Sequence, residues 1–221
     1  MNQTPVDIMK NSLLAAFGLF CFGVGVYLTI QANIGVAPWD AFCIGLSRTL
    51  GILYGSASII ISLTIVVIDL LLKERIGIGM ILDTLLVGKT VDLCNWLDLI
   101  PPFQNLFASI LLMLAGLFVM GFSQYLYMKA ALTCGPRDAM LVALGKRMPR
   151  VPLGVISIGI LAVVLTIGWA LGGPIGIGTV ISALCMGPMM QLAFTLVKFD
   201  ATKVEHQDLL QSAGILTGKK A

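Results

Sequence analysis

The motif Pro-x-Asp followed by alanine occurs twice in the chain, at residues 38–40 and again at residues 136–138. Proline is favoured in the first turn of a helix, because its missing N–H would have no partner there anyway. An aspartate two residues later meets the positive end of the helix dipole. The two motifs therefore predict two short helices, at 38–50 and 136–148, each about 20 Å long and too short to cross a bilayer.

The charged residues of these motifs, Asp40, Arg137 and Asp138, are candidates for binding a solute, a cation or a proton. Helix capping alone is the alternative interpretation for the two aspartates. The first turns that follow are apolar on all sides, whereas a helix lying on the membrane surface should have one polar face. Re-entry into the protein interior is therefore favoured over a surface position.

Three charged residues, Asp83, Lys89 and Asp92, fall within one apolar stretch. A charge at the centre of a bilayer costs at least about 2.5–3.5 kcal/mol on insertion scales. Lys89 and Asp92 are three residues apart and can meet on one helix face, whereas Asp83 points away and needs another partner. Either a structural ion pair or a solute-binding site explains them. Asp69, four residues before Lys73, is interpreted as half of a surface ion pair.

Five further polar residues are noted at predicted membrane depth: Tyr27, Gln31, Asn33, Gln124 and Tyr125. They could line the same cavity as the charged residues. Hydrogen bonding between helices explains them equally well.

Enzyme chemistry has no support in the sequence. Motifs of zinc proteases, serine hydrolases and nucleotide-binding loops are absent. The five cysteines form no metal-binding pattern, and the one histidine, His206, lies in a polar tail. We therefore expect no metal, no cofactor and no catalytic residue.

The composition is that of a membrane protein. Of 221 residues, 58% are hydrophobic and 11% are charged, with mean hydropathy +0.99, whereas soluble proteins have about 25% charged residues. We expect a single all-α membrane domain over 1–221, with the lipid bilayer as its partner. The net charge of +3 is too small to suggest nucleic acid, and a homo-oligomer is compatible with the sequence.

Six stretches are long enough, or nearly so, to cross about 30 Å of hydrocarbon. They are 12–33, 54–72, 76–97, 105–130, 152–172 and 174–197. With six spans, twelve of the 14 Lys and Arg residues fall on the side of the termini, Arg48 falls on the other side, and Lys89 lies within a span. This bias predicts that both termini are cytoplasmic, including a polar tail at 199–221.

The chain also repeats itself. A shift of 98 residues aligns the two Pro-x-Asp-Ala motifs, and a shift of 99 aligns Ile-Gly-Ile-Gly at 76–79 with its copy at 175–178. The halves, 12–98 and 105–198, hold three spans each, so the second half is inverted relative to the first. Inverted repeats are common in secondary transporters, although some channels have them too.

Several of these segments resemble the YczE/YitT-type bacterial membrane proteins. The similarity lies in ANIGVAPWD at 32–40, RIGIG at 75–79 with the DxLLVG that follows, and GPRDAM at 135–140. The resemblance implies a location in the bacterial inner membrane and no particular mechanism.

Together, these features favour a secondary transporter of a small polar solute. A substrate-binding membrane subunit of a multi-component transporter and a non-transporting membrane component are the alternatives. The substrate and the coupling ion are left open.

Overall fold

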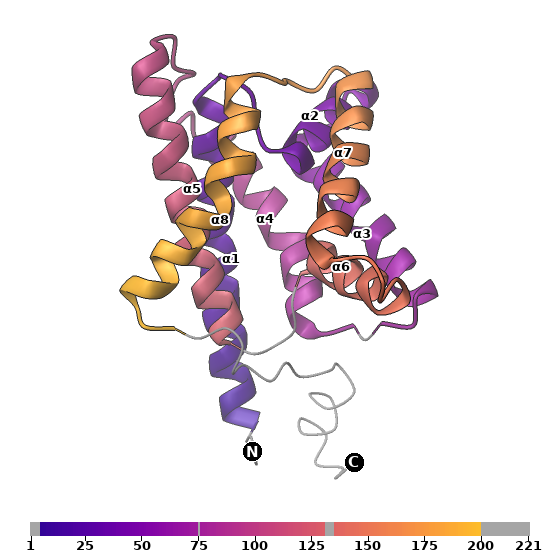
Figure 1. Cartoon of the computed structure of the whole chain (residues 1–221). Helices are drawn as coiled ribbons and strands as arrows, with labels where there is room; N and C mark the ends of the chain where they lie inside the picture. The colour runs from indigo at the N-terminus through magenta and orange to yellow at the C-terminus, as the bar shows by residue number, and fades with distance from the viewer. Residues whose placement is uncertain (1–4, 75, 131–134, 200–221) are drawn as a thin grey trace.

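The computed structural model describes residues 5–74, 76–130 and 135–199. In this part of the chain it contains eight α-helices and no strand (Figure 1). They are α1 (Pro5–Gln31), α2 (Pro38–Leu50), α3 (Tyr54–Leu71), α4 (Ile78–Trp96), α5 (Leu106–Lys129), α6 (Pro136–Arg147), α7 (Leu153–Ala170) and α8 (Ile177–Leu196). The predicted polar tail, apart from Phe199, lies outside the described residues, as does His206.

The two short helices predicted from the Pro-x-Asp motifs are confirmed as α2 and α6. Gly51 ends α2 in the left-handed conformation, with φ 65°, which glycine adopts without steric cost. The first long helix, α1, begins earlier than predicted and ends two residues sooner. The chain turns there through Asn33 and Gly35, which both have positive φ.

Five helices are long and apolar enough to cross a membrane: most of α1, and all of α3, α5, α7 and α8. The remaining predicted span, α4, has 19 residues but carries Asp83, Lys89 and Asp92. Its charge content, rather than its length, separates it from the other five. The described chain is therefore an all-helical protein with several membrane-spanning helices.

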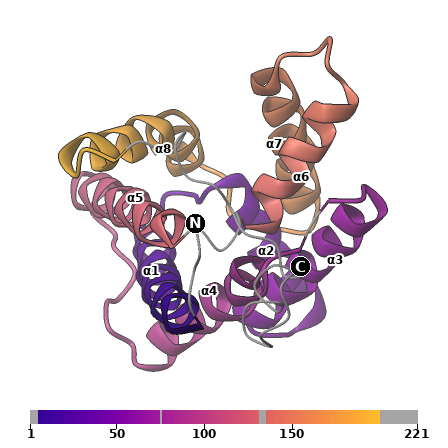
Figure 2. The ribbon, with the colours of Figure 1, turned by 90° about the horizontal axis from the view of Figure 1, so that it is seen from below.

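The helices form two groups. In one group α5 packs against both α1 and α8, and in the other α2 and α6 pack against α3 and α7. Helix α4 joins the groups, because it packs against α1 on one side and α3 on the other (Figures 1 and 2). Helix α1 begins and α8 ends at the same end of the molecule, the lower end in Figure 1.

Glycines allow close helix packing at several of these contacts. The backbone of Gly55 in α3 lies directly against Gly88 in α4, and both are buried. By contrast, α7 and α8 barely touch. Gly154 in α7 and Gly187 in α8 are exposed, and a side chain at either position would meet no described atom within 4 Å.

Candidate functional site

The starts of α2 and α6 come together inside the molecule. The guanidinium of Arg137 lies over the ring of Trp39, 4.9 Å from its centre, which is a favourable cation–π geometry. Trp39 and Arg137 are the middle residues of the two Pro-x-Asp motifs. The two motifs, predicted separately, therefore form one site.

Asp40 is buried in this site, with 3% of its surface exposed. Its carboxylate accepts a hydrogen bond of 2.9 Å from the hydroxyl of Tyr54, the first residue of α3. The guanidinium of Arg137 is close enough to attract it electrostatically. Asp40 thus joins α2 to neighbouring helices, which a role in capping its own helix does not explain.

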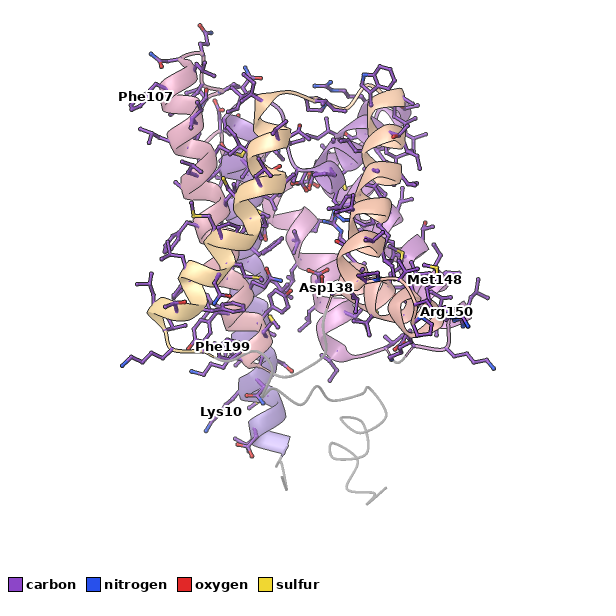
Figure 3. The ribbon with its side chains drawn as sticks, viewed as in Figure 1. Lys10, Phe107, Asp138, Met148, Arg150 and Phe199 are labelled. Atoms are coloured by element: carbon purple, nitrogen blue, oxygen red, sulfur yellow. The ribbon has the colours of Figure 1, made fainter. Side chains whose placement is uncertain are left out.

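Asp83 is contributed by α4. Its carboxylate lies next to Gly135, the residue that precedes α6, and it interacts electrostatically with Arg137 and Asp138. Arg137 is therefore the partner that the sequence required for Asp83. Asp138, labelled in Figure 3, is exposed. Its carboxylate is 3.5 Å from the hydroxyl of Tyr127.

We call Asp40, Tyr54, Asp83, Arg137 and Asp138 the central charge cluster. It combines three carboxyl groups with one guanidinium, from four different helices. Charges at membrane depth are costly unless paired and commonly mark pathways for ions, protons or solutes. Among the described residues, no three His, Cys, Asp or Glu side chains are placed so that they could hold one metal ion. Carboxyl groups beside a guanidinium can exchange protons or form hydrogen bonds with a polar solute.

The predicted ion pair between Lys89 and Asp92 is wrong. The described structure has no ion pair between them, and the Lys89 side chain is exposed. Asp92 instead accepts a hydrogen bond of 2.8 Å from the backbone N–H of Gly55. The first N–H groups of α3 lack partners within their own helix, and Leu53 offers no capping side chain. The carboxylate of Asp92 fills that role from α4.

A cavity, which we call the polar pocket, lies near the C-terminal end of α4. Its volume is about 830 Å³. Its polar lining comes from Gln31, Asn33, Ser47, Arg48, Tyr54, Asp92 and Asn95. Tyr54 connects the two sites, because it lines the polar pocket while its hydroxyl donates to Asp40 in the central charge cluster.

Tyr27 has a structural role. It is 1% exposed, and its hydroxyl both donates to the carbonyl oxygen of Ile100 and accepts from its N–H, at 3.0 and 2.9 Å. Gln31 and Asn33 hold the same part of the chain: the carbonyl of Gln31 and the amide of Asn33 both bond to the backbone of Phe103. These two residues also line the polar pocket, whereas Tyr27 does not.

Tyr125 lies away from both sites. Its hydroxyl accepts a hydrogen bond of 3.2 Å from Lys129, and its ring packs on Phe122 and Phe199. It is not part of the central charge cluster or the polar pocket.

Asp69 is not the surface residue that its spacing from Lys73 indicated. It is 0% exposed, and neither carboxyl oxygen has a hydrogen-bond partner in the described structure. Lys73 is exposed and bends away with a positive φ of 57°, so the predicted pair does not form.

The site residues that were not predicted include Trp39, Arg48 and Tyr54. Trp39 could have been found, because the shift of 98 residues aligns it with Arg137. Arg48 was noted only as the basic residue on the side opposite the termini. Tyr54 has no signal in the sequence beyond its place at the start of a span.

Comparison with known proteins gives the family. Residues 9–195 match the model of a family of unknown function, DUF6198. The chain belongs to this family. Its relatives include an uncharacterised membrane protein of Bacillus subtilis, YczE, which is 31% identical over 80% of this chain and 81% of that protein. An uncharacterised protein of Haemophilus influenzae is 27% identical over 85% of each chain.

A second Bacillus subtilis relative, the uncharacterised protein YyaS, is 28% identical over 80% of this chain and 88% of its own length. No solved structure matches. The resemblance to YczE seen in the sequence is therefore confirmed, and a multi-pass membrane protein of the DUF6198 family is the firm conclusion.

Proposed function

We propose that this protein is a secondary transporter that moves a small polar solute across the bacterial inner membrane by alternating access. In this proposal all six long helices, including α4, cross the membrane, with both termini in the cytoplasm. The supporting observation is that two equivalent pairs of helices, one in each half, are packed differently in the same molecule.

The contacts between helices support an inverted repeat. Gly18 of α1 packs against Leu126 of α5, and Gly116 of α5 packs against Leu28 of α1. A shift of 98 residues takes Gly18 to Gly116 and Leu28 to Leu126, so the two contacts are equivalent. Likewise α1 packs on α4 as α5 packs on α8, and α2 packs on α7 as α6 packs on α3.

The contacts at the C-terminal ends of the two short helices are also repeated when the halves are exchanged. Arg48 near the end of α2 donates a hydrogen bond of 2.7 Å to the carbonyl of Gly172, just beyond α7. Its equivalent, Lys146 near the end of α6, forms an ion pair of 2.8 Å with Glu74, just beyond α3. Each half therefore binds the other half through the basic residue of its short helix.

The symmetry is broken at one contact, between the second and third spans of each half. In the first half Gly55 and Gly88 touch, and Asp92 bonds to the start of α3. A shift of 99 residues leads to Gly154, Gly187 and Gln191, which are all exposed, on helices that barely touch.

Because the halves are inverted in this proposal, these two contacts lie towards opposite faces of the membrane. A transporter that is closed on one face and separated on the other is one state of an alternating-access cycle. The opposite state would have Gly154 against Gly187 and the contact between Gly55 and Gly88 broken. The central charge cluster lies between the two contacts and is suited to hold the solute or the coupling ion.

Transport is tested with purified full-length protein in liposomes that are incubated with a mixture of small polar metabolites and an ion gradient. Uptake is measured by mass spectrometry of the liposome contents. We expect one solute class to accumulate with wild-type protein and not with Arg137→Gln of matched folding. Binding of a solute without accumulation would indicate the substrate-binding subunit instead, and neither binding nor accumulation would contradict the transporter.

A further inference from the structure

The polar pocket holds two opposite charges that are not paired with each other or with another charge in the described structure, Asp92 and Arg48. Its volume of about 830 Å³ lies within the range of pockets that bind small molecules, roughly 300–1,000 Å³. The polar pocket is a separate site from the central charge cluster, because Tyr54 is the one residue that the two share.

Asp92 provides the negative side of the pocket. One carboxyl oxygen accepts from the N–H of Gly55, while the other is buried without any hydrogen-bond partner. Lys89, the nearest lysine in the sequence, does not pair with it. A buried carboxylate without a cationic partner is costly, and Asp92 lines the pocket, so a ligand ammonium group beside Asp92 would supply the missing charge.

Arg48 provides the positive side. One of its N–H groups donates to the carbonyl of Gly172 at 2.7 Å, and its side chain is otherwise exposed at the pocket. A guanidinium has five N–H donors, so most of them are free to bind a carboxylate in a charge-assisted geometry.

The rest of the lining is mostly apolar, with added amides. The apolar lining includes five isoleucines, Ile30, Ile34, Ile44, Ile52 and Ile175. Gln31 donates to Asn95 at 3.3 Å across the pocket wall, which leaves the second amide hydrogen of Gln31 and the amide group of Asn95 for a ligand. A ligand that fits has an ammonium group, a carboxylate and a compact apolar part.

We propose that the polar pocket binds a small zwitterion of the amino-acid type, with its ammonium group at Asp92, its carboxylate at Arg48 and its apolar part against the isoleucines. The proposal rests on the proposed transport function for its biological meaning, since it names the class of solute carried. Binding itself needs neither transport nor an ion gradient, so it can be tested separately.

The test uses three probes with one carbon skeleton: leucine, 3-methylbutylamine, which lacks the carboxylate, and 4-methylpentanoate, which lacks the ammonium group. Binding to purified full-length protein is measured by isothermal titration calorimetry at pH 7. The variants are Asp92→Asn, which keeps an acceptor for the N–H of Gly55, and Arg48→Gln. Arg150→Gln, at an exposed position away from the pocket (Figure 3), is the control.

Leucine should bind the wild type and the control equally, and each pocket variant should weaken it at least about tenfold, since a hydrogen bond to a charged group contributes roughly 1.5–3 kcal/mol. The amine should be weakened by Asp92→Asn alone and the acid by Arg48→Gln alone. Unchanged leucine binding in both variants, or no binding of any probe to folded wild-type protein, would overturn the proposal. Transport of another solute class would then leave the proposed function intact.

Discussion

Two aspartates of α4 each lie at the start of another helix. Asp92 accepts from Gly55 in the first turn of α3, and Asp83 lies beside Gly135, which precedes α6. Neither α3 nor α6 has a capping side chain of its own. Because the start of a helix carries unpaired N–H groups and partial positive charge, these contacts explain how α4 accommodates two carboxylates within an apolar helix bundle.

The loss of this contact should be measurable. We expect Asp92→Ala to lower the free energy of unfolding by about 1–2 kcal/mol, as for other lost helix caps. Lys89→Ala should change it by less than about 0.5 kcal/mol, because Lys89 has no ion-pair partner in the described structure and is exposed. Thermal unfolding in detergent gives both values. Equal losses of stability in the two variants would indicate that Lys89 and Asp92 do form an ion pair.

A second residue-scale prediction concerns Asp69, whose carboxyl group is fully buried without a hydrogen-bond partner. Removing an uncompensated charge from a buried position should stabilise the fold. Asp69→Asn should therefore raise the melting temperature, by about 2–4 °C for each kcal/mol gained. Asp98→Asn, at an exposed position, is the control and should have no effect. A lower melting temperature for Asp69→Asn would mean that the charge has a stabilising partner in the membrane.

The central charge cluster leads to a prediction on coupling. Asp40→Asn keeps an acceptor for the hydroxyl of Tyr54 and removes one negative charge beside Arg137. We expect it, and Asp138→Asn, to fold normally and to lose uptake driven by an ion or proton gradient in liposomes. Tyr54→Phe, which removes the hydrogen bond but no charge, should keep driven uptake. If both aspartate variants show the uptake and the pH dependence of the wild type, these carboxylates do not take part in coupling transport to the gradient.

At the scale of elements, the sequence predicted helices better than their contacts. Proline and glycine mark the bounds of α2 and α6 locally, so these helices could be found from their own residues. The contact between Trp39 and Arg137 depends on tertiary packing, which no local pattern encodes. The pairing of Lys89 with Asp92 failed for the same reason: spacing shows which residues share a face, not whether a neighbouring helix offers a better partner.

Whether α7 and α8 come together in another state of the protein can be tested with cysteines. Gly154 and Gly187 both have room for a side chain. In a background without the native cysteines, Gly154→Cys with Gly187→Cys should form a disulfide under mild oxidation, because the proposed opposite state brings the two together to within disulfide reach. Gly159→Cys with Gly187→Cys is the control, since Ile60, the equivalent of Gly159, is exposed.

Cross-linking is measured as a mobility shift of protein in native membranes and needs no substrate. The control pair should not cross-link. If the pair at 154 and 187 also stays reduced, the two halves do not exchange their packing. The proposed function would then need a different conformational change.

At the scale of the whole molecule, the loops between α4 and α5 and between α7 and α8 both contribute to the polar pocket, so they lie at the same end of the protein. Pro102 and Pro174 both line the pocket. We expect this end to face the outside of the cell. Cysteines placed at 101–104 and 172–174 should therefore react with a membrane-impermeant maleimide in intact cells. Cysteines at 74 and 148 should react only after the cells are opened, because the basic residues predict that the opposite end is cytoplasmic. External labelling at 148 would contradict the inverted repeat.

The contact between Trp39 and Arg137 requires that the two halves of the protein differ in sequence at this position. In the proposed repeat these residues are equivalent to each other, so the position lies on the symmetry axis and meets its own copy. Two identical half-length chains that associated in opposite orientations would bring together either two tryptophans, with no charge, or two arginines, which repel. Two copies that differ in sequence, as the halves of this fused chain do, can instead hold a single positive charge at the centre against an aromatic ring.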